Sequence, residues 1–118
     1  MNKPYVSIVL TVYNGEKTLG LCLDSLTNLD YPKENLEIIV VDNNSTDTTK
    51  EIIRRYRVKY LFESKRGAPA AFNRGIQNSS GEIVAFTHSD CVVARNWIKN
   101  IVKGFTDSSI GGCGGKVL

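Results

Sequence analysis

The sequence predicts an α/β fold with three layers, α/β/α, in which helices cover both faces of a mainly parallel sheet. Short runs rich in Val, Ile and Leu alternate along the chain with segments whose apolar residues recur at helical spacing. Strands that alternate with helices form parallel sheets, because each helix returns the chain to the same end of the sheet. A length of 118 residues and a hydrophobic content of 42% fit one folded domain.

The first strand and the first helix are predicted from two different apolar patterns. A run rich in Val, Ile and Thr over Tyr5–Val12 is typical of a buried strand, and Asn14-Gly15 supplies the turn after it. A helix is expected over Glu16–Thr27, because four apolar residues fall on one of its faces. These residues are Leu19, Cys22, Leu23 and Leu26. A second apolar run predicts another strand over Leu36–Val41.

The middle of the chain continues the alternation. Ser45 is a favoured N-cap residue, and we expect the helix after it to run to about Tyr56. A short third strand is predicted over Val58–Phe62. The next helix is expected over Ala68–Gln77, with Pro69 in its first turn, where proline is tolerated.

The last third of the chain is predicted to hold one more strand and one more helix. Glu82–Thr87 is an apolar run that indicates the fourth strand. Asn96–Phe105 has an apolar stripe at helical spacing that includes Trp97, which we therefore expect in the core. A fifth strand over Ile110–Leu118 is only weakly predicted, because glycine disfavours strand interiors.

Composition excludes several classes of function. The net charge of +3 is mild, and the basic cluster of residues 54–59 spans a helix end, so nucleic-acid binding is not indicated. The three cysteines are widely spaced and form no CxxC pair, which predicts reduced thiols in a cytoplasmic protein. No apolar run approaches the ~20 residues needed to span a bilayer. Contact with the inner membrane surface would need partners or regions outside this sequence.

Two acidic turns are the strongest functional signal. Asp42 and Asp90 each follow an apolar run, so each carboxylate should lie just past the C-terminal end of a strand. In open α/β sheets, ligands bind in the crevice outside those strand ends. A carboxylate there can hold a ribose or base edge, or a divalent cation that carries phosphates. This combination suggests a nucleotide diphosphate ligand.

The residues within these turns allow more than one interpretation. For Asp42 we favour a hydrogen bond from a base N–H over a capping role, whereas Ser45 and its neighbours are expected to cap the next helix. For Asp90 we favour binding of Mg²⁺ or Mn²⁺ over a plain turn carboxylate. His88, two residues earlier, could ligate a softer cation, donate to a phosphate or simply occupy the turn.

Two further segments are candidates for the same ligand. Thr11, Tyr13 and Asn14 end the first strand and would face the crevice, although they could equally form a polar turn. Arg66 lies in a basic, glycine-containing loop ahead of a helix, and Asn73 lies within that helix. Such a loop is a reasonable anion site, and it falls between the two acidic turns.

Taken in order, these segments resemble family 2 glycosyltransferases with the GT-A fold, whose nucleotide-binding half is Rossmann-like. The resemblance covers essentially the whole chain, and the order and spacing of its segments make it strong. It rests on residues 6–14, 40–47, 67–76 and 81–90. It implies a nucleotide-sugar donor, with a UDP-sugar favoured over a GDP-sugar, and transfer of the sugar with inversion.

The resemblance also implies roles for individual residues. The end of the first strand would line the nucleotide pocket, Asp42 would contact the base, and Arg66 and Asn73 would lie near the ribose or diphosphate. The family's Asp-x-Asp motif falls on residues 88–90, so Asp90 would hold the divalent cation, with His88 and Ser89 beside the nucleotide sugar. His88 stands where the family usually has the first Asp, which places the ribose contact and the choice of metal in question.

The family's catalytic domain is longer than this chain. Its second half carries the acceptor pocket and the general base, so we interpret residues 1–118 as a single, truncated, donor-binding half with no catalytic residue of its own. By itself this half is expected to be inactive. The acceptor is unknown and would belong to glycan or cell-envelope biosynthesis. Uncovered sheet edges favour a homo-oligomer that forms through Ile110–Leu118.

Two other functions were weighed. One is a non-catalytic nucleotide-binding or interaction module, which His88 and the missing base would favour. The other is a nucleotidyltransferase that makes sugar nucleotides. It ranks last, because residues 11–15 lack the glycine-rich, basic loop that such an enzyme needs after its first strand.

Overall fold

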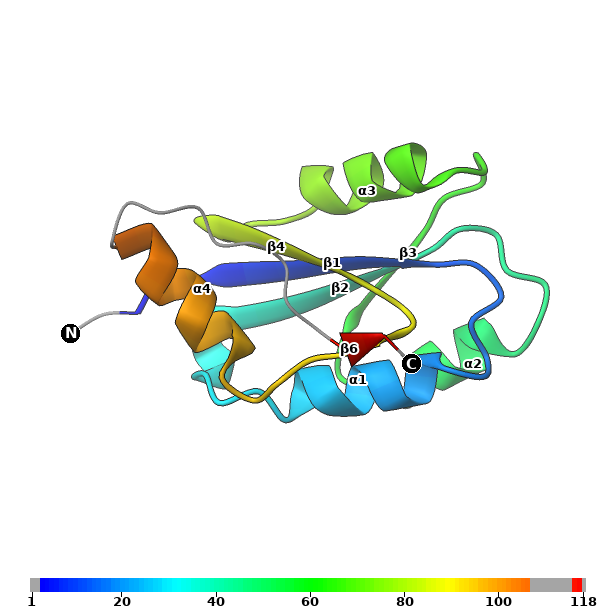
Figure 1. The fold of residues 1–118 in the computed structure, drawn as a ribbon. Coiled ribbons are helices and arrows are strands. Elements are labelled where there is room, and N and C mark those ends of the chain that lie inside the picture. Colours follow the sequence, from blue (N-terminus) through cyan, green and yellow to red (C-terminus); the bar gives the residue numbers. More distant parts are fainter. Residues whose placement is uncertain (1–2, 107–115, 118) are drawn as a thin grey trace.

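The computed structural model describes residues 3–106 and 116–117 of the chain. Four strands form one all-parallel sheet in the order β3-β2-β1-β4. Their bounds are β1 Val6–Val12, β2 Leu36–Asp42, β3 Lys59–Phe62 and β4 Ile83–His88. The predicted three-layer α/β/α arrangement is confirmed, because helices lie on both faces of this sheet (Figure 1). The helices are α1 Leu19–Thr27, α2 Thr49–Ile53, α3 Ala68–Gln77 and α4 Trp97–Thr106.

The central strand β1 is buried on both faces. Val6, Ile8 and Leu10 pack in a core cluster that also contains residues of α1 and α4. Val9 points the other way and packs with Ala71 of α3. This alternation follows from the two-residue period of a strand, and it explains why apolar residues occur on both faces of this segment.

Most element bounds agree with the sequence prediction. The predicted and observed limits of α3 are identical, and the limits predicted for the four strands of the main sheet shift by one residue at most at either end. The apolar face predicted for α1 is fully buried. Trp97 is buried as expected, although its indole N–H has no partner in the described part of the chain.

The first two helices are shorter than predicted. α1 begins at Leu19, because Thr18 before it has a φ of −120°, which is outside the helical range. α2 ends at Ile53 rather than near Tyr56, since Arg55 and Tyr56 donate their N–H groups to carbonyls three residues back. Such bonds tighten a helix end and stop its continuation.

A second, two-stranded sheet follows β4. The short strand β5 (Cys91–Val92) pairs antiparallel with β6 (Lys116–Val117). The weakly predicted strand over Ile110–Leu118 is therefore present only as β6, and most of that segment lies outside the described residues. The predicted oligomer contact through it lies there too. A 3₁₀ turn, η1 (Lys33–Asn35), leads into β2. None of the helices in residues 3–106 is long and apolar enough to cross a membrane.

The strand order places a topological switch point between β1 and β4. From β1 the chain first adds β2 and β3 on one side and then crosses to add β4 on the other. In a doubly wound sheet, ligands bind outside the carboxyl ends of the strands at this point. A ligand site is therefore expected at the carboxyl ends of β1 and β4.

A close approach of α3 to the sheet depends on Gly75. A Cβ atom built there would collide with Val9 Cγ1 and would lie 3.3 Å from Val41 Cγ2. The helix can rest on β1 and β2 at this depth only because the residue has no side chain.

We expect Gly75→Ala to lower the free energy of unfolding by about 1–3 kcal/mol, because the added methyl group overpacks this face. Urea unfolding measures the change. Gly20→Ala is the matched control, since Gly20 also lies in a helix but its nearest Cβ contact is Tyr56 Oη at 3.9 Å. That control should be neutral or stabilise by up to about 1 kcal/mol. Equal effects of the two substitutions would contradict the packing argument.

Candidate functional site

The parallel register brings three predicted site residues to one edge of the sheet. Thr11 of β1 is the partner of His88 at the end of β4, and Val12 is the partner of Asp42 at the end of β2. The ends of three neighbouring strands thus carry the two acidic turns and the polar turn of residues 13–15. These three turns lie at the same edge although they come from distant parts of the sequence.

The turns after β1 and β2 are joined by hydrogen bonds. Asn14 donates its backbone N–H to Ser45 Oγ at 2.9 Å, and its side-chain Oδ1 accepts from the N–H of Thr46 at 2.7 Å. The predicted capping role of Ser45 is therefore wrong. Ser45 Oγ is directed to the turn after β1, and the N-cap of α2 is Thr48, which makes no side-chain capping bond.

Asp47 extends this connection toward the start of α2. Its Oδ1 accepts from the backbone N–H of Thr49 at 2.9 Å, and its Oδ2 accepts from the N–H of Glu16 at 3.2 Å. Desolvation alone would raise the pKa of Asp47, but the hydrogen bonds from Thr49 and Glu16 outweigh it and hold the pKa below its usual range. Gly15 completes the join by donating its N–H to Thr49 Oγ1 at 3.0 Å.

Asp42 lies beneath these turns and is only 3% exposed. Its Oδ1 accepts from the N–H of Ser45 at 3.0 Å, and its Oδ2 accepts from Tyr60 Oη at 2.8 Å. Burial and this bond raise the pKa of Tyr60 to about 12, so the phenol stays a donor. The Asp42 carboxylate thus fixes the backbone of Ser45 and the phenol of Tyr60 beneath the two turns. Its contact with a base stays a prediction.

Asn43 is a positioning residue that the sequence analysis missed. It is 5% exposed, and its Nδ2 donates to the carbonyls of Glu63 at 3.0 Å and Lys65 at 2.8 Å. Its Oδ1 accepts from the N–H of Gly67 at 2.9 Å. One amide therefore satisfies three backbone groups of the loop that carries Arg66. The sequence signal for it is a polar side chain directly after a buried strand, which is also typical of a helix cap.

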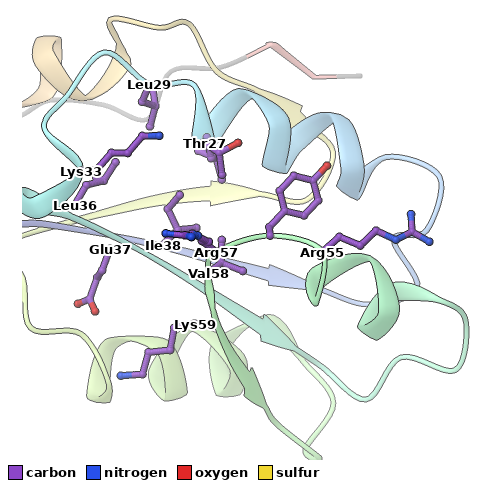
Figure 2. Close-up of a pocket in the computed structure, with 12 residues that line it drawn as sticks. Thr27, Leu29, Lys33, Leu36, Glu37, Ile38, Arg55, Arg57, Val58 and Lys59 are labelled. Carbon is purple, nitrogen blue, oxygen red and sulfur yellow. The ribbon is translucent and has the colours of Figure 1, made fainter.

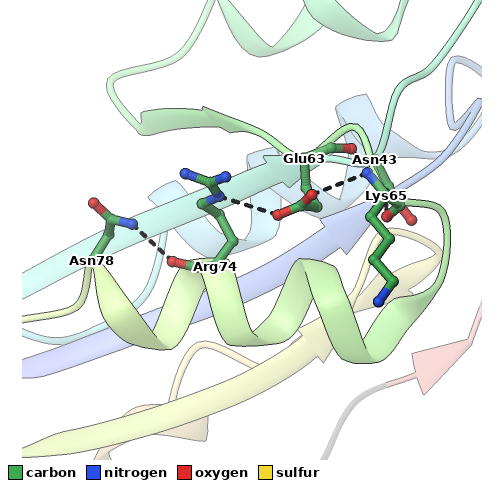
Figure 3. A network of polar contacts seen from close by, with 5 residues as sticks. All are labelled: Asn43, Glu63, Lys65, Arg74 and Asn78. Carbon is green, nitrogen blue, oxygen red and sulfur yellow. Dashed lines mark hydrogen bonds and ion pairs between the residues drawn. The ribbon is translucent and has the colours of Figure 1, made fainter.

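A second set of contacts holds the same loop from the side of α3 (Figure 3). The Glu63 carboxylate accepts from Arg74 Nε at 3.2 Å with one oxygen and from the N–H of Lys65 at 3.0 Å with the other. The bond to Lys65 comes first among the causes that lower the pKa of Glu63. Arg74 therefore holds the loop of residues 63–67 in place and does not face the edge where the strand ends meet.

Arg66 and Tyr13 are brought together as predicted site residues. The guanidinium carbon of Arg66 lies 3.4 Å from the centroid of the Tyr13 ring, a cation–π contact. Tyr13 is 42% exposed, so an aromatic face and a cation are presented together at the ligand edge. Asn73 is exposed on α3, and no contact in the described residues joins it to the other predicted site residues.

The turn after β4 completes the edge. His88 is exposed, and its ring packs edge-on against Phe72 of α3, with the centroids 6.1 Å apart. Ser89 is half-buried beside Gly15, since a Cβ on that glycine would lie 3.6 Å from Ser89 Oγ. Below them Cys22 Sγ donates to the His88 carbonyl at 3.4 Å. Burial is the main cause that raises the pKa of this thiol to about 12, so it acts as a neutral packing group.

The Asp90 carboxylate could act as one of the ligands of a divalent cation. It is exposed, and its one contact given by the structure is a weak one from the Cys91 thiol at 3.8 Å. Residues 3–106 and 116–117 contain no group of three or more His, Cys, Asp or Glu side chains that could cage a cation. Mg²⁺ and Mn²⁺ are often held by one or two carboxylates while substrate phosphates and water complete the shell. A single open carboxylate fits that mode.

Comparison with known sequences gives consistent matches. The model of the family described as "Glycosyl transferase family 2" matches residues 7–117. Glycosyltransferase AglE of Haloferax volcanii is 37% identical over 120 residues, which cover 97% of this chain and 40% of the relative. A Methanococcus voltae enzyme is 33% identical over 108 residues, covering 86% of this chain and 34% of its own length. It is named dolichyl N-acetyl-alpha-D-glucosaminyl phosphate 3-beta-D-2,3-diacetamido-2,3-dideoxy-beta-D-glucuronosyltransferase.

Solved structures agree with these sequence matches. A mannosyltransferase of Pyrobaculum calidifontis in complex with GDP-Man and Mn²⁺ superposes with a TM-score of 0.82 and 32% identity, over 87% of this chain and 32% of that one. S. aureus TarS 1–349 in complex with UDP-GlcNAc gives a TM-score of 0.76 and 32% identity, over 87% and 31% of the two chains. This chain therefore spans well under half the length of the proteins it matches.

We expect Asn43→Asp to lower the free energy of unfolding by about 2–3 kcal/mol, because it replaces the amide donor with an oxygen that faces two carbonyls. Urea unfolding measures this. Asn44→Asp is the matched control, since Asn44 is exposed at a φ of 65° that Asp tolerates. It should stay within about 0.5 kcal/mol. A near-neutral Asn43→Asp would show that the amide does not hold the loop.

We also expect the stability of the joined turns to depend on acid pH through Asp47. Its pKa is lower in the folded than in the unfolded chain, so its stabilisation is present above about pH 4 and is lost as the pH falls through the folded pKa. Urea unfolding between pH 6 and pH 3 should show a shallower decline for Asp47→Asn than for the unmodified chain. Parallel curves for the two proteins would contradict this assignment.

Proposed function

This chain belongs to glycosyl transferase family 2, as its sequence resemblance predicted, and on that premise we propose that it is the donor-binding half of a glycosyltransferase. The donor is a nucleotide diphosphate sugar. The observation that carries the proposal is the contact of Arg66 with Tyr13 just past the end of β1, beside β4, whose end is followed by the exposed Asp90. An aromatic face, a cation and an open carboxylate match the base, the diphosphate and its counter-ion.

The joined turns give this edge its rigidity before a ligand arrives. Asn14, Ser45 and Asp47 hold the turns after β1 and β2 together, and Asn43 holds the loop of Arg66. A preorganised edge loses less conformational freedom on binding, which favours affinity. Tyr13 would stack on the base, and Arg66, freed from the ring, would reach the diphosphate.

A divalent cation held by Asp90, Mg²⁺ or Mn²⁺, would offset negative charge on the nucleotide leaving group. The support is the open carboxylate of this chain, together with Mn²⁺ in the complex of the mannosyltransferase described above. The imidazole of His88 lies at the end of β4, where it packs against the ring of Phe72. It would donate a hydrogen bond to the ribose or to a phosphate, alongside Ser89.

The finer features of the reaction follow from the family. We infer inversion at the transferred carbon, a preference for a UDP-sugar and an acceptor in glycan or cell-envelope biosynthesis. The general base and the acceptor pocket would lie outside these 118 residues. The enzyme would act on the cytoplasmic side, where nucleotide sugars are made.

Calorimetric titration of UDP into this chain, with and without Mn²⁺, tests the donor site. We expect binding that Mn²⁺ strengthens and that Asp90→Ala weakens by at least about tenfold, since the carboxylate is the protein's own hold on the cation. Glu34→Ala is the matched control, because it removes an exposed carboxylate from η1, which leads into the opposite end of β2. GDP, titrated in parallel, reports on the choice of base.

Three results would count against parts of the proposal. An absence of heat at millimolar UDP and GDP would make donor binding untenable. Binding that ignores both Mn²⁺ and Asp90→Ala would remove the metal role and favour a non-catalytic nucleotide-binding module. Tighter binding of GDP than of UDP would overturn the preference for a UDP-sugar.

A further inference from the structure

A groove lies at the opposite edge of the sheet from the candidate donor site (Figure 2). It is formed by the N-terminal ends of β2 and β3, the end of α1 and the chain that follows α2. Its volume is about 760 Å³, which is within the range of small-molecule sites. The candidate donor site lies at the carboxyl ends of the strands, so the groove and that site are at opposite edges of the sheet.

The floor of the groove is aliphatic and aromatic. It is lined by side chains that also pack against the main core, so the floor is held in place. These residues are Leu26, Leu29, Leu36, Ile38, Tyr56 and Val58. An apolar floor of this kind favours a ligand with a hydrocarbon part over a fully hydrated ion.

The rim of the groove is cationic. Lys33, Arg55 and Arg57 line it and are exposed, and no carboxylate in the described part of the chain forms an ion pair with them. The single lining carboxylate, Glu37, turns to the other face of the sheet, where it accepts from Ser7 Oγ at 2.5 Å. Three cations thus surround an apolar floor without a carboxylate to balance them.

Lys59 differs from these three cations. It also lines the groove, but its Nζ donates to the carbonyl of Asn78 at 3.0 Å, beyond the end of α3. Figure 2 shows Lys59 and Glu37 extending toward the same side, away from Lys33. The free positive charge on the groove face therefore comes from Lys33, Arg55 and Arg57.

We propose that this groove binds an anionic phospholipid of a membrane surface. The cations would pair with the phosphate of the headgroup, and the apolar floor would cover the first carbons of an acyl chain. An acidic peptide would use the cations but would leave the aliphatic floor without a matching group. The proposal does not depend on the proposed donor site, because no residue is shared between the two.

Docking through this groove would fix the orientation of the protein. The strand β1 has seven residues, and at ~3.3 Å per residue it spans roughly 23 Å between the two edges. The donor edge would then face the aqueous side, where a water-soluble nucleotide sugar arrives. This chain would thus contribute its own membrane contact, in addition to any that partners or other regions provide.

Vesicle flotation with the 118-residue chain tests the proposal. We expect binding to vesicles of phosphatidylglycerol and phosphatidylcholine and little binding to pure phosphatidylcholine. Arg55→Glu combined with Arg57→Glu should weaken binding by at least about tenfold, because each basic contact at an anionic surface is worth about fivefold in affinity. Lys33→Glu, on a separate element, should weaken it in the same direction. Circular dichroism confirms that each variant is folded.

The matched control is Lys17→Glu combined with Arg54→Glu. It changes the net charge equally, and both residues are exposed but lie outside the groove lining. We expect it to reduce vesicle binding less than twofold. Loss equal to that of the groove variant would mean plain charge attraction and would overturn the site.

Two competitors identify the chemistry of the ligand. Glycerol phosphate at millimolar concentration should not displace the protein from vesicles, because it offers the anion without the hydrocarbon chain. Displacement by glycerol phosphate would overturn the lipid in favour of a free phosphate. Polyglutamate that binds as tightly as the vesicles would overturn it in favour of an acidic protein segment. An absence of vesicle binding would overturn it outright, and a parallel UDP titration would show whether the donor site is intact.

Discussion

The placement of β1 between β2 and β4 is the constraint on which the rest of the structure depends. All three strands run in the same direction, and β1 is buried on both faces. A parallel pairing puts every carboxyl end at one edge, so the polar residues that follow the strands must share a small space. It also puts every amino end at the opposite edge, where the cationic groove forms.

The turns at the donor edge show how that shared space is organised. Backbone groups past a strand end have no ladder partner, and buried N–H groups left without a partner are costly. Asn14, Ser45 and Asp47 accept from these groups across the two turns, and Asn43 serves three groups of the next loop. Short polar side chains here replace the sheet's hydrogen bonds, and Arg66 packs on the exposed ring of Tyr13 at the same edge.

The two edges of the sheet present different sets of side chains. The donor edge offers an aromatic face, a cation and an open carboxylate, a set suited to a hydrated nucleotide. The groove at the other edge offers aliphatic side chains beneath unpaired cations, a set suited to an amphiphile. The strands between them keep the two surfaces apart, so a ligand bound at one would leave the other open to solvent.

The sequence by itself determined the layers, the strand ends and the family, because the period of apolar residues and the residues after each strand are local properties. It identified Asp42, Asp90, Tyr13 and Arg66 as edge residues for the same reason. Tertiary structure alone decided what Ser45 and Asn43 do, since their partners are 31 and 20–24 residues away. It also decided the short α2 and the groove, because both depend on how distant segments pack against the ends of the strands.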